Sequence, residues 1–463
     1  MDKKVITLLK TQCFIDGKWV GTPEIPVTNP ATGEEIAKVP RLGTAETKQA
    51  IDAAEKAFKP WSQLLAKERA AILRKWFDLQ VAHADELALL LTSEQGKPLA
   101  EARGEIIYGA SFTEFYAEEA KRIYGETIPS FKQGSRIIVI KQPLGVVGAI
   151  TPWNFPLARI TRKVSPLTAL ALAELARQAG IPPGVFNVIT GKSAEIGKEL
   201  TTSPKVRGIT FTGSTEIGKV LMEQSASTIK KVELELGGNA PFLVFDDADI
   251  DKAIEGAMAS KYRNAGQTCV CANRLLVQEG VYDEFVAKLA KAASAMKVGD
   301  GTESGVLQGP LINKAAIEKV EEHIADAVSK GAKIVTGGKR HKLGGTFFEP
   351  TVLSGVTSDM KCAREETFGP VAPVFKFKTE AEGIAMANDT EFGLACYFYA
   401  RDIGRVWRVA EGLEYGMVGI NEGIISTEVA PFGGVKESGL GREGSAHGID
   451  GFVELKYMLM GGL

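Results

Sequence analysis

The chain has 463 residues, a formal net charge of −2 at pH 7 and five cysteines. Its length exceeds what a single hydrophobic core usually supports, so we expect two or three domains. The near-neutral charge, without long runs of one sign, argues against nucleic-acid partners and against an anionic membrane surface. No apolar stretch approaches the roughly 20 residues of a membrane span. Because the cysteines lack a spaced framework and residues 1–20 carry no signal-peptide pattern, we expect a cytoplasmic protein.

The first elements in chain order are helical. Between residues 44 and 120, apolar side chains recur three and four positions apart, which predicts amphipathic helices. Residues 136–143 are rich in β-branched side chains and end in proline, which is typical of a strand outside the main sheet. Near the C-terminus, residues 451–458 alternate like an edge strand. Such a strand needs a partner, on this chain or on another subunit.

The middle of the chain alternates between short apolar strands and helical stretches. The predicted strands are residues 144–151, 185–190, 208–212 and 231–236. This pattern is typical of a parallel, doubly wound sheet of the kind that binds dinucleotides. A second α/β series runs from about 248 to 420, with strands at 274–278 and 372–377, and we assign it to another domain.

Several kinds of active site are excluded by their missing motifs. The four histidines do not form HExxH or a metal-binding spacing with cysteines, so we expect no metal site. Cys269-Val-Cys271 is a CxC pair without a second pair. Neither a GxSxG serine elbow nor a Walker loop is present.

Two side chains are candidates for chemistry from their local sequence. Cys269 follows Asn264-Ala-Gly-Gln-Thr, a small polar stretch that can expose a thiol, although a buried structural cysteine fits the same pattern. Glu235 stands at the end of an apolar strand that runs into Gly237-Gly238, where open α/β sheets bind ligands. From these residues alone, a solvated strand face that Glu235 shares with Glu233 and Lys231 is the favoured interpretation. We interpret Cys13, Cys362 and Cys396 as structural.

Six short motifs together resemble the signature series of the NAD(P)-dependent aldehyde dehydrogenases, in order and over nearly the whole chain. They are PWNFP (152–156), FTGST (211–215), LELGG (234–238), GQTC (266–269), ETFGP (366–370) and PFGG (431–434). The resemblance implies an α/β fold with three parts, assembled as a homodimer or homotetramer. These are a variant Rossmann cofactor domain (1–125 and 142–236), an α/β catalytic domain (237–440) and a small β oligomerisation element (126–141 and 441–463).

The resemblance also implies a role for each catalytic residue. Cys269 becomes the nucleophile that attacks the aldehyde carbon, forming a thiohemiacetal that loses hydride to nicotinamide and leaves a thioester. Glu235 becomes the general base that activates water for deacylation. The Asn154 side-chain amide and the Cys269 backbone N–H would stabilise the oxyanion.

For the cofactor, NAD or NADP, the resemblance implies contacts along one edge of the site. Gly213 and Ser214 resemble the turn where the pyrophosphate meets a helix N-terminus. Glu366 resembles the residue that holds the nicotinamide ribose, and Phe368 the ring packed beside it. The remaining expected cofactor contacts are Ile150, Trp153 and Leu236.

Within the family, residues 160–163, 261–271 and 419–426 look most like succinate-semialdehyde dehydrogenases, which implies oxidation of succinate semialdehyde to succinate. Arg162 and Arg263 match positions that bind the distal carboxylate of this small-molecule substrate, and two guanidinium groups can fork onto one carboxylate. Ser426 or Thr427 would add a hydroxyl. Glutarate semialdehyde is an alternative substrate, and either arginine could instead be a surface ion-pair partner.

Cys271 resembles the second cysteine of a pair that closes a reversible disulfide with the nucleophile in this group. A small core side chain is the alternative interpretation. Both interpretations stay open at the level of sequence.

The chain departs from the family pattern after Pro166, where it runs directly into a helical stretch at 167–176. The family has a glycine turn, a strand and a Lys-Pro loop there, about 15–20 residues or the size of one strand with its loops. That segment supplies the lysine that contacts the adenosine ribose. One alternative is therefore a deletion-impaired homologue that retains only scaffold or esterase function. The other is that the sequence omits residues of the molecule.

Overall fold

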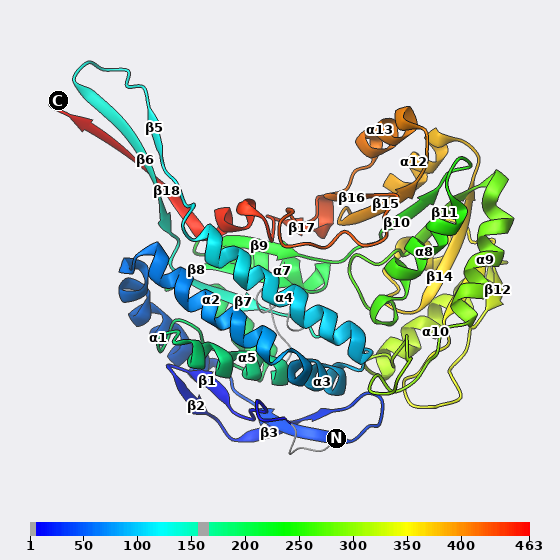
Figure 1. Cartoon of the computed structure of the whole chain (residues 1–463), viewed down its shortest axis with the longest axis horizontal. Helices are drawn as coiled ribbons and strands as arrows, with labels where there is room; N and C mark the ends of the chain where they lie inside the picture. Colours follow the sequence, from blue (N-terminus) through cyan, green and yellow to red (C-terminus); the bar gives the residue numbers. More distant parts are fainter. Residues whose placement is uncertain (1–5, 156–165) are drawn as a thin grey trace.

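The computed structural model describes residues 6–155 and 166–463 (Figure 1). Four helices cover most of the stretch predicted to be helical between 44 and 120, so that prediction is confirmed. They are α1 (Thr44–Gln63), α2 (Ala66–Ala82), α3 (Ala84–Gln95) and α4 (Leu99–Glu119). α3 ends at Gly96, whose φ of 95° is the left-handed conformation that glycine adopts at helix C-termini. The apolar helix α5 (Pro166–Ala179) packs against α2 and α3.

The cofactor-type sheet has the strand order β17-β9-β8-β7 among the described residues. Its members are β7 (Val146–Ile150), β8 (Val206–Thr212), β9 (Lys231–Glu235) and β17 (Gly439–Leu440). β7, β8 and β9 run parallel, as predicted from their alternation with helices, and the late segment β17 returns antiparallel to β9. α6 (Ser193–Thr202) and α7 (Thr215–Ala226) are the helices that flank β8 along the chain.

The prediction of a fourth parallel strand at 185–190 is wrong. These residues form only an isolated antiparallel bridge between Val188 and Phe14. Phe14 belongs to β1 (Cys13–Ile15), which pairs with β2 (Lys18–Val20) beside a second hairpin of β3 (Pro23–Thr28) and β4 (Glu35–Pro40). Val188 is therefore buried beside the N-terminal hairpin, Phe186 and Ile189 are partly buried, and β7 pairs directly with β8.

A second, seven-stranded sheet has the order β12-β13-β14-β11-β10-β15-β16. The strands are β10 (Pro241–Val244), β11 (Arg274–Gln278), β12 (Lys333–Thr336), β13 (Thr351–Ser354), β14 (Val371–Phe377), β15 (Ala395–Tyr399) and β16 (Met417–Ile420). Only β12 is antiparallel to its neighbour, and β10, β14 and β15 are almost entirely buried, because helices cover both faces of the sheet. The helices are α8 (Ile250–Lys261), α9 (Tyr282–Ser294), α10 (Lys314–Ser329), α11 (Lys361–Arg364), α12 (Glu380–Asn388) and α13 (Ile403–Gly412).

A three-stranded antiparallel arm projects from the body of the molecule (Figure 1). It consists of β5 (Glu126–Ile128), β6 (Ser135–Pro143) and β18 (Val453–Gly461). The two strands predicted near 136–143 and 451–458 are confirmed, and they pair with each other along their full length. Nowhere in residues 6–155 and 166–463 does a helix combine the length and apolar character that a membrane crossing requires.

Candidate active site

The segment that carries Cys269 is a buried left-handed turn. After α8, Asn264, Ala265 and Gly266 have φ values of 52°, 55° and 75°. Consecutive residues in this region are strained, and such strain is concentrated at functional sites. Gly266 is required, because a Cβ at this position would lie 2.1 Å from the Gly369 carbonyl oxygen. The turn presses the loop of Cys269, which is 8% exposed, against the ETFGP motif 100 residues later.

Asn154 is bound to this loop by hydrogen bonds in both directions. Its Nδ2 donates to the Gln267 carbonyl at 3.1 Å. Its own carbonyl accepts from Asn264 Nδ2 at 3.0 Å. An amide NH₂ has two hydrogens, so one remains to face a substrate oxygen. The structure thus brings Asn154 to the loop that carries Cys269, although these two predicted site residues are far apart in the sequence.

Glu235 ends β9 and is 2% exposed, so the interpretation as a solvated strand face is wrong for this residue. The segment 433–441 returns over the end of β9 and covers it. A Cβ on Gly433 would lie 2.9 Å from Glu235 Oε1, and a Cβ on Gly238 would lie 2.4 Å from the Cys269 carbonyl oxygen. The LELGG motif is therefore in close contact with both the PFGG motif and the backbone of Cys269.

The predicted pyrophosphate turn lies between β8 and α7. Gly213 N donates to the Glu235 carbonyl at 3.1 Å, which ties the turn to the end of β9. Ser214 caps α7, with its hydroxyl accepting from Ile217 N at 3.4 Å. Ile150 and Leu236 pack together in the apolar cluster beneath this turn. The backbone N–H groups at the start of a helix suit an anion such as pyrophosphate.

The predicted nicotinamide side is marked by an aromatic pair. The rings of Trp153 and Phe368 lie edge to face, with centroids 5.8 Å apart, and Phe368 has a left-handed φ of 54°. Glu366 Oε2 would lie 3.4 Å from a Cβ on Gly237, directly after the strand of Glu235. The cofactor residues predicted from the motifs therefore follow one path from Ser214 toward Cys269.

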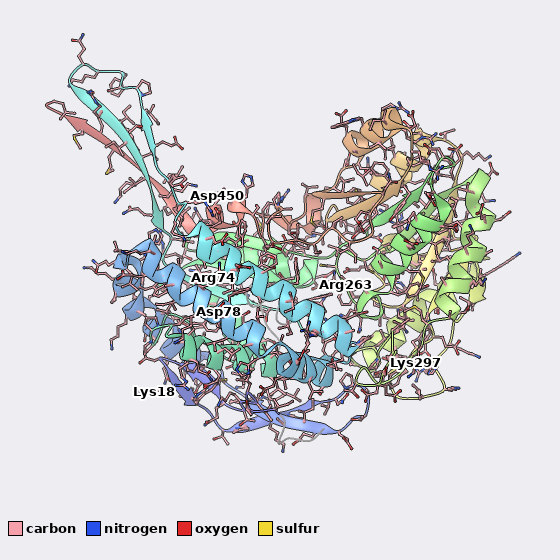
Figure 2. All side chains as sticks on the ribbon, in the orientation of Figure 1. Lys18, Arg74, Asp78, Arg263, Lys297 and Asp450 are labelled. Carbon is pink, nitrogen blue, oxygen red and sulfur yellow. The ribbon has the colours of Figure 1, made fainter. Side chains whose placement is uncertain are left out.

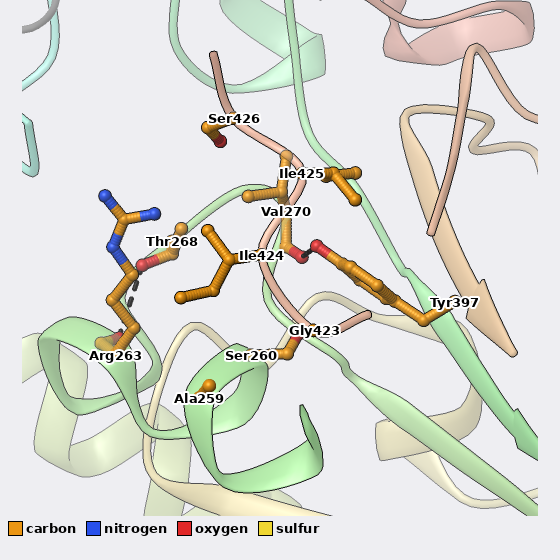
Figure 3. Close-up of a pocket in the computed structure, with 10 residues that line it drawn as sticks. All are labelled: Ala259, Ser260, Arg263, Thr268, Val270, Tyr397, Gly423, Ile424, Ile425 and Ser426. Atoms are coloured by element: carbon orange, nitrogen blue, oxygen red, sulfur yellow. Dashed lines mark hydrogen bonds between the residues drawn. The ribbon is translucent and has the colours of Figure 1, made fainter. Parts of the chain in front are cut away.

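A pocket beside the nucleophile loop contains Arg263 and Ser426 (Figure 3). Figure 2 places Arg263 between the N-terminal helices and the seven-stranded sheet. The pocket is also lined by Ala259, Ser260, Thr268, Val270, Tyr397, Gly423, Ile424 and Ile425. Arg263 is the cation among the described residues that line the pocket.

Of the two hydroxyl residues predicted to contact the substrate, Ser426 lines the pocket. The Thr427 hydroxyl donates instead to Glu428 Oε2 at 3.3 Å. Tyr397 was not predicted, because a tyrosine in the buried strand β15 carries no local sign of function. Its hydroxyl donates to the Val270 carbonyl at 2.7 Å and fixes the wall of the pocket. Arg162 lies outside the described residues.

Cys271 is buried behind the nucleophile. Both cysteines are free thiols, and burial raises the pKa of Cys271, while the nearby Lys261 ammonium opposes that shift. Lys261 Nζ lies 3.6 Å from Cys271 Sγ. The residues that the structure describes contain no cluster of three His, Cys, Asp or Glu side chains with the geometry of a metal site.

Comparison with known proteins identifies close relatives over the full length of the chain. It is 62% identical to a glutarate-semialdehyde dehydrogenase of Pseudomonas aeruginosa, covering all of both proteins. It is 61% identical to the NADP-dependent succinate-semialdehyde dehydrogenase of Escherichia coli, covering 98% of each. The crystal structure of succinate-semialdehyde dehydrogenase from Burkholderia pseudomallei matches with a TM-score of 0.97 at 59% identity, over 98% of this chain and 99% of that one.

The comparison also measures how much shorter this chain is. The alignment with the P. aeruginosa enzyme extends over 483 positions, whereas the chain has 463 residues, so at least 20 aligned positions (483 − 463) have no residue here. This number agrees in size with the segment that the motifs indicate is missing after Pro166. The relatives are named enzymes, and the comparison gives no support to a scaffold without activity.

The family is settled by the extent of the match. The model of the aldehyde dehydrogenase family matches residues 19–458, which include all six motifs and every predicted site residue. The chain therefore belongs to the aldehyde dehydrogenase family.

Proposed function

We propose that the chain oxidises succinate semialdehyde to succinate, with NAD or NADP as hydride acceptor. The observation that carries this proposal is the pocket of Arg263 and Ser426, which adjoins the loop of Cys269. A guanidinium and a hydroxyl recognise a carboxylate at the far end of a short aldehyde. Relatives named for succinate semialdehyde and for glutarate semialdehyde are about equally similar, so the five-carbon homologue is a second candidate substrate.

The buried residues act in sequence. Cys269 Sγ, once deprotonated, adds to the aldehyde carbon, while the second hydrogen of the Asn154 amide and the Cys269 N–H hold the resulting oxyanion. NAD or NADP, when bound, would supply the hydride acceptor. Departure of the hydride from the former aldehyde carbon converts the oxyanion to a thioester on Cys269. Glu235 then takes a proton from water, which attacks the thioester and releases the acid and the free thiol.

The cofactor assignment rests on two groups of residues, one for the pyrophosphate and one for the nicotinamide riboside. The turn at Gly213 and Ser214 suits the pyrophosphate, and Glu366, Phe368 and Trp153 would hold the nicotinamide riboside against Cys269. Ile150 and Leu236 support this path from below.

The domain division and the assembly are part of the same proposal. Residues 1–125 and 142–236 form the cofactor domain, 237–440 the catalytic domain, and 126–141 with 441–463 the oligomerisation element. In the arm, Leu455, Tyr457 and Met460 are 66%, 57% and 51% exposed. Exposed apolar side chains on a projecting sheet favour burial by another subunit, hence a homodimer or homotetramer. A cytoplasmic location remains a prediction.

Arg263→Ala tests the substrate. Because the change removes the pocket's charged partner, kcat/KM for succinate semialdehyde should fall by about 30- to 100-fold, mainly through KM. Butanal, which has no carboxylate, should lose less than about threefold. The measurement is steady-state kinetics with both aldehydes.

The matched control is Arg401→Ala, an exposed arginine that pairs with Asp249 and does not line the pocket. It should leave both substrates unchanged. An equal loss with both aldehydes in Arg263→Ala would make Arg263 structural and remove the distal carboxylate from the proposal.

Cys271 supplies a test of redox sensitivity. We expect peroxide to inactivate the enzyme in a way that thiol reductant reverses, through a strained Cys269–Cys271 disulfide that is easily reduced. In Cys271→Ser the inactivation should no longer be reversible, because the nucleophile would oxidise further. Reversibility that is the same in both proteins would leave Cys271 as a small core side chain.

A further inference from the structure

One buried ion pair lies outside the residues assigned to the reaction and directly behind Asn154. Lys97 follows α3 and is 2% exposed, and Glu105 on α4 is 1% exposed. The Lys97 ammonium lies 2.5 Å from Glu105 Oε2 and donates to the Asn154 carbonyl at 2.8 Å. It also lies 3.9 Å from the centre of the Phe155 ring.

Burying the two charges of this ion pair costs free energy. Burial lowers the pKa of Lys97, and the Glu105 carboxylate opposes that shift. A buried ion pair often adds little to stability compared with apolar side chains of similar size, because both charges lose their hydration. Its retention is more easily explained by the conformation that it fixes.

The conformation that it fixes is that of Asn154. β7 ends at Ile150, so the backbone of residues 151–155 has no strand partner in the described part of the chain, and its carbonyls need other donors. Asn154 O receives two, Lys97 Nζ and Asn264 Nδ2. With the backbone held in this way, the side-chain amide is directed at the nucleophile loop, where it donates to Gln267 O.

The same short segment also supports the other half of the site. Gln95 Nε2 donates to Asn264 Oδ1 at 2.9 Å, and Gln95 Oε1 accepts from Lys97 N at 3.0 Å. Glu101 accepts from Asn264 N at 2.9 Å. The residues between α3 and the start of α4 thus hold Asn154 and the left-handed turn in one hydrogen-bonded unit.

We propose that the Lys97–Glu105 pair is a positioning element that orients the Asn154 amide toward the oxyanion. This inference rests on the proposed function, in which Asn154 stabilises the oxyanion. Lys97 acts only through Asn154 and does not touch the substrate. Its effect must therefore depend on the presence of the Asn154 side chain.

A double-mutant cycle tests this dependence. Lys97→Met keeps the length of the side chain and removes its charge, and it should lower the rate of the first hydride-transfer turnover by about 10- to 100-fold, with KM for the aldehyde changed less than about threefold. In an Asn154→Ala background the same change should lower the rate less than about twofold further, because the group that it positions is gone. Full, multiplicative losses would overturn the proposal.

Three further measurements keep the result interpretable. Arg103→Met, an exposed arginine on α4 that pairs with Asp85, is the matched control and should leave the rate unchanged. Glu105→Gln, which keeps Lys97 and weakens its fixation, should show a smaller loss with the same dependence on Asn154, and it replaces Lys97→Met if that variant does not fold. The cycle is repeated with p-nitrophenyl acetate, whose hydrolysis at Cys269 needs the oxyanion but no cofactor. If the parent does not oxidise aldehydes, but the effects of Lys97→Met and Asn154→Ala on ester hydrolysis are coupled, the dehydrogenase function is overturned and the positioning role is supported. If the parent oxidises aldehydes and the two effects are independent, only the positioning role is overturned.

Discussion

Cys269→Ala is expected to abolish both aldehyde oxidation and ester hydrolysis, a loss of at least about 1,000-fold in kcat. The thiol forms the covalent bond in both reactions, and the neighbouring residues cannot replace it. Glu235→Gln should differ: one equivalent of reduced cofactor should form rapidly, followed by turnover slowed about 100-fold or more, because only deacylation needs the base. The measurement is a stopped-flow record of reduced nicotinamide at equal enzyme concentrations.

Cys362→Ala is the matched control for this experiment. Cys362 is a fully buried cysteine in a hydrophobic core beside the seven-stranded sheet, and burial raises its pKa to about 12, so it is an unreactive thiol. Its replacement should cost about 1 kcal/mol of stability, or less, and leave the rate unchanged. Residual turnover in Cys269→Ala equal to that of the parent would end the assignment of the nucleophile. A Glu235→Gln protein without a burst would place Glu235 in the first step as well.

The sequence predicted the elements whose pattern is local. Strands 274–278 and 208–212 were found because their apolar residues are continuous and each is bounded by helices. Residues 185–190 have a similar composition, but the partner that decides their place is Phe14, about 170 positions earlier. Local pattern cannot distinguish a strand of the central sheet from a segment that packs on an N-terminal hairpin.

At the site too, local sequence pattern does not reveal features that depend on distant contacts. Glu235 lies on the same face of its strand as Glu233 and Lys231, and nothing in that stretch distinguishes the buried carboxylate from a solvated one. Its burial is caused by the segment around Gly433, which lies 198 positions away, and no periodicity near Glu235 indicates that this segment covers it. The motifs of the family identified the residue, whereas composition and periodicity did not. Lys97 was missed for the converse reason, since a single lysine after a helix is usually solvated and only its contact with Asn154 shows otherwise.

The open edge of the four-stranded sheet at β7 should strongly affect cofactor binding. Among the described residues β7 pairs only with β8, so the ladder groups on the other side of Val146–Ile150 have no strand partner there. The family resemblance assigns to the missing segment a strand and the lysine that contacts the adenosine ribose. The turn at Ser214 and the aromatic pair at Phe368 then hold only the middle and the nicotinamide end of the cofactor.

Grafting the strand, with its loops and lysine, that the family resemblance assigns to the Pro166 junction should therefore tighten binding of NADP by about two to four decades in Kd. It should also raise the melting temperature, because a sheet strand regains its partner. The graft must end before Pro166, since Glu94 accepts hydrogen bonds from Leu167 N at 3.0 Å and Thr168 N at 2.9 Å and so anchors the start of α5. The measurement is a calorimetric titration on protein whose intact mass matches the 463-residue chain, beside the grafted variant.

A Gly-Ser insert of equal length at the same junction separates the strand from mere chain length. Such an insert relaxes the connection but has low strand propensity and no lysine, so it should leave cofactor affinity near that of the parent. If the parent already binds NADP at micromolar concentration, or if both inserts improve binding alike, the missing strand is not what limits cofactor binding. The remaining contacts from Ser214 to Phe368 would then suffice, and the adenosine end of the cofactor would contribute little to affinity in this enzyme.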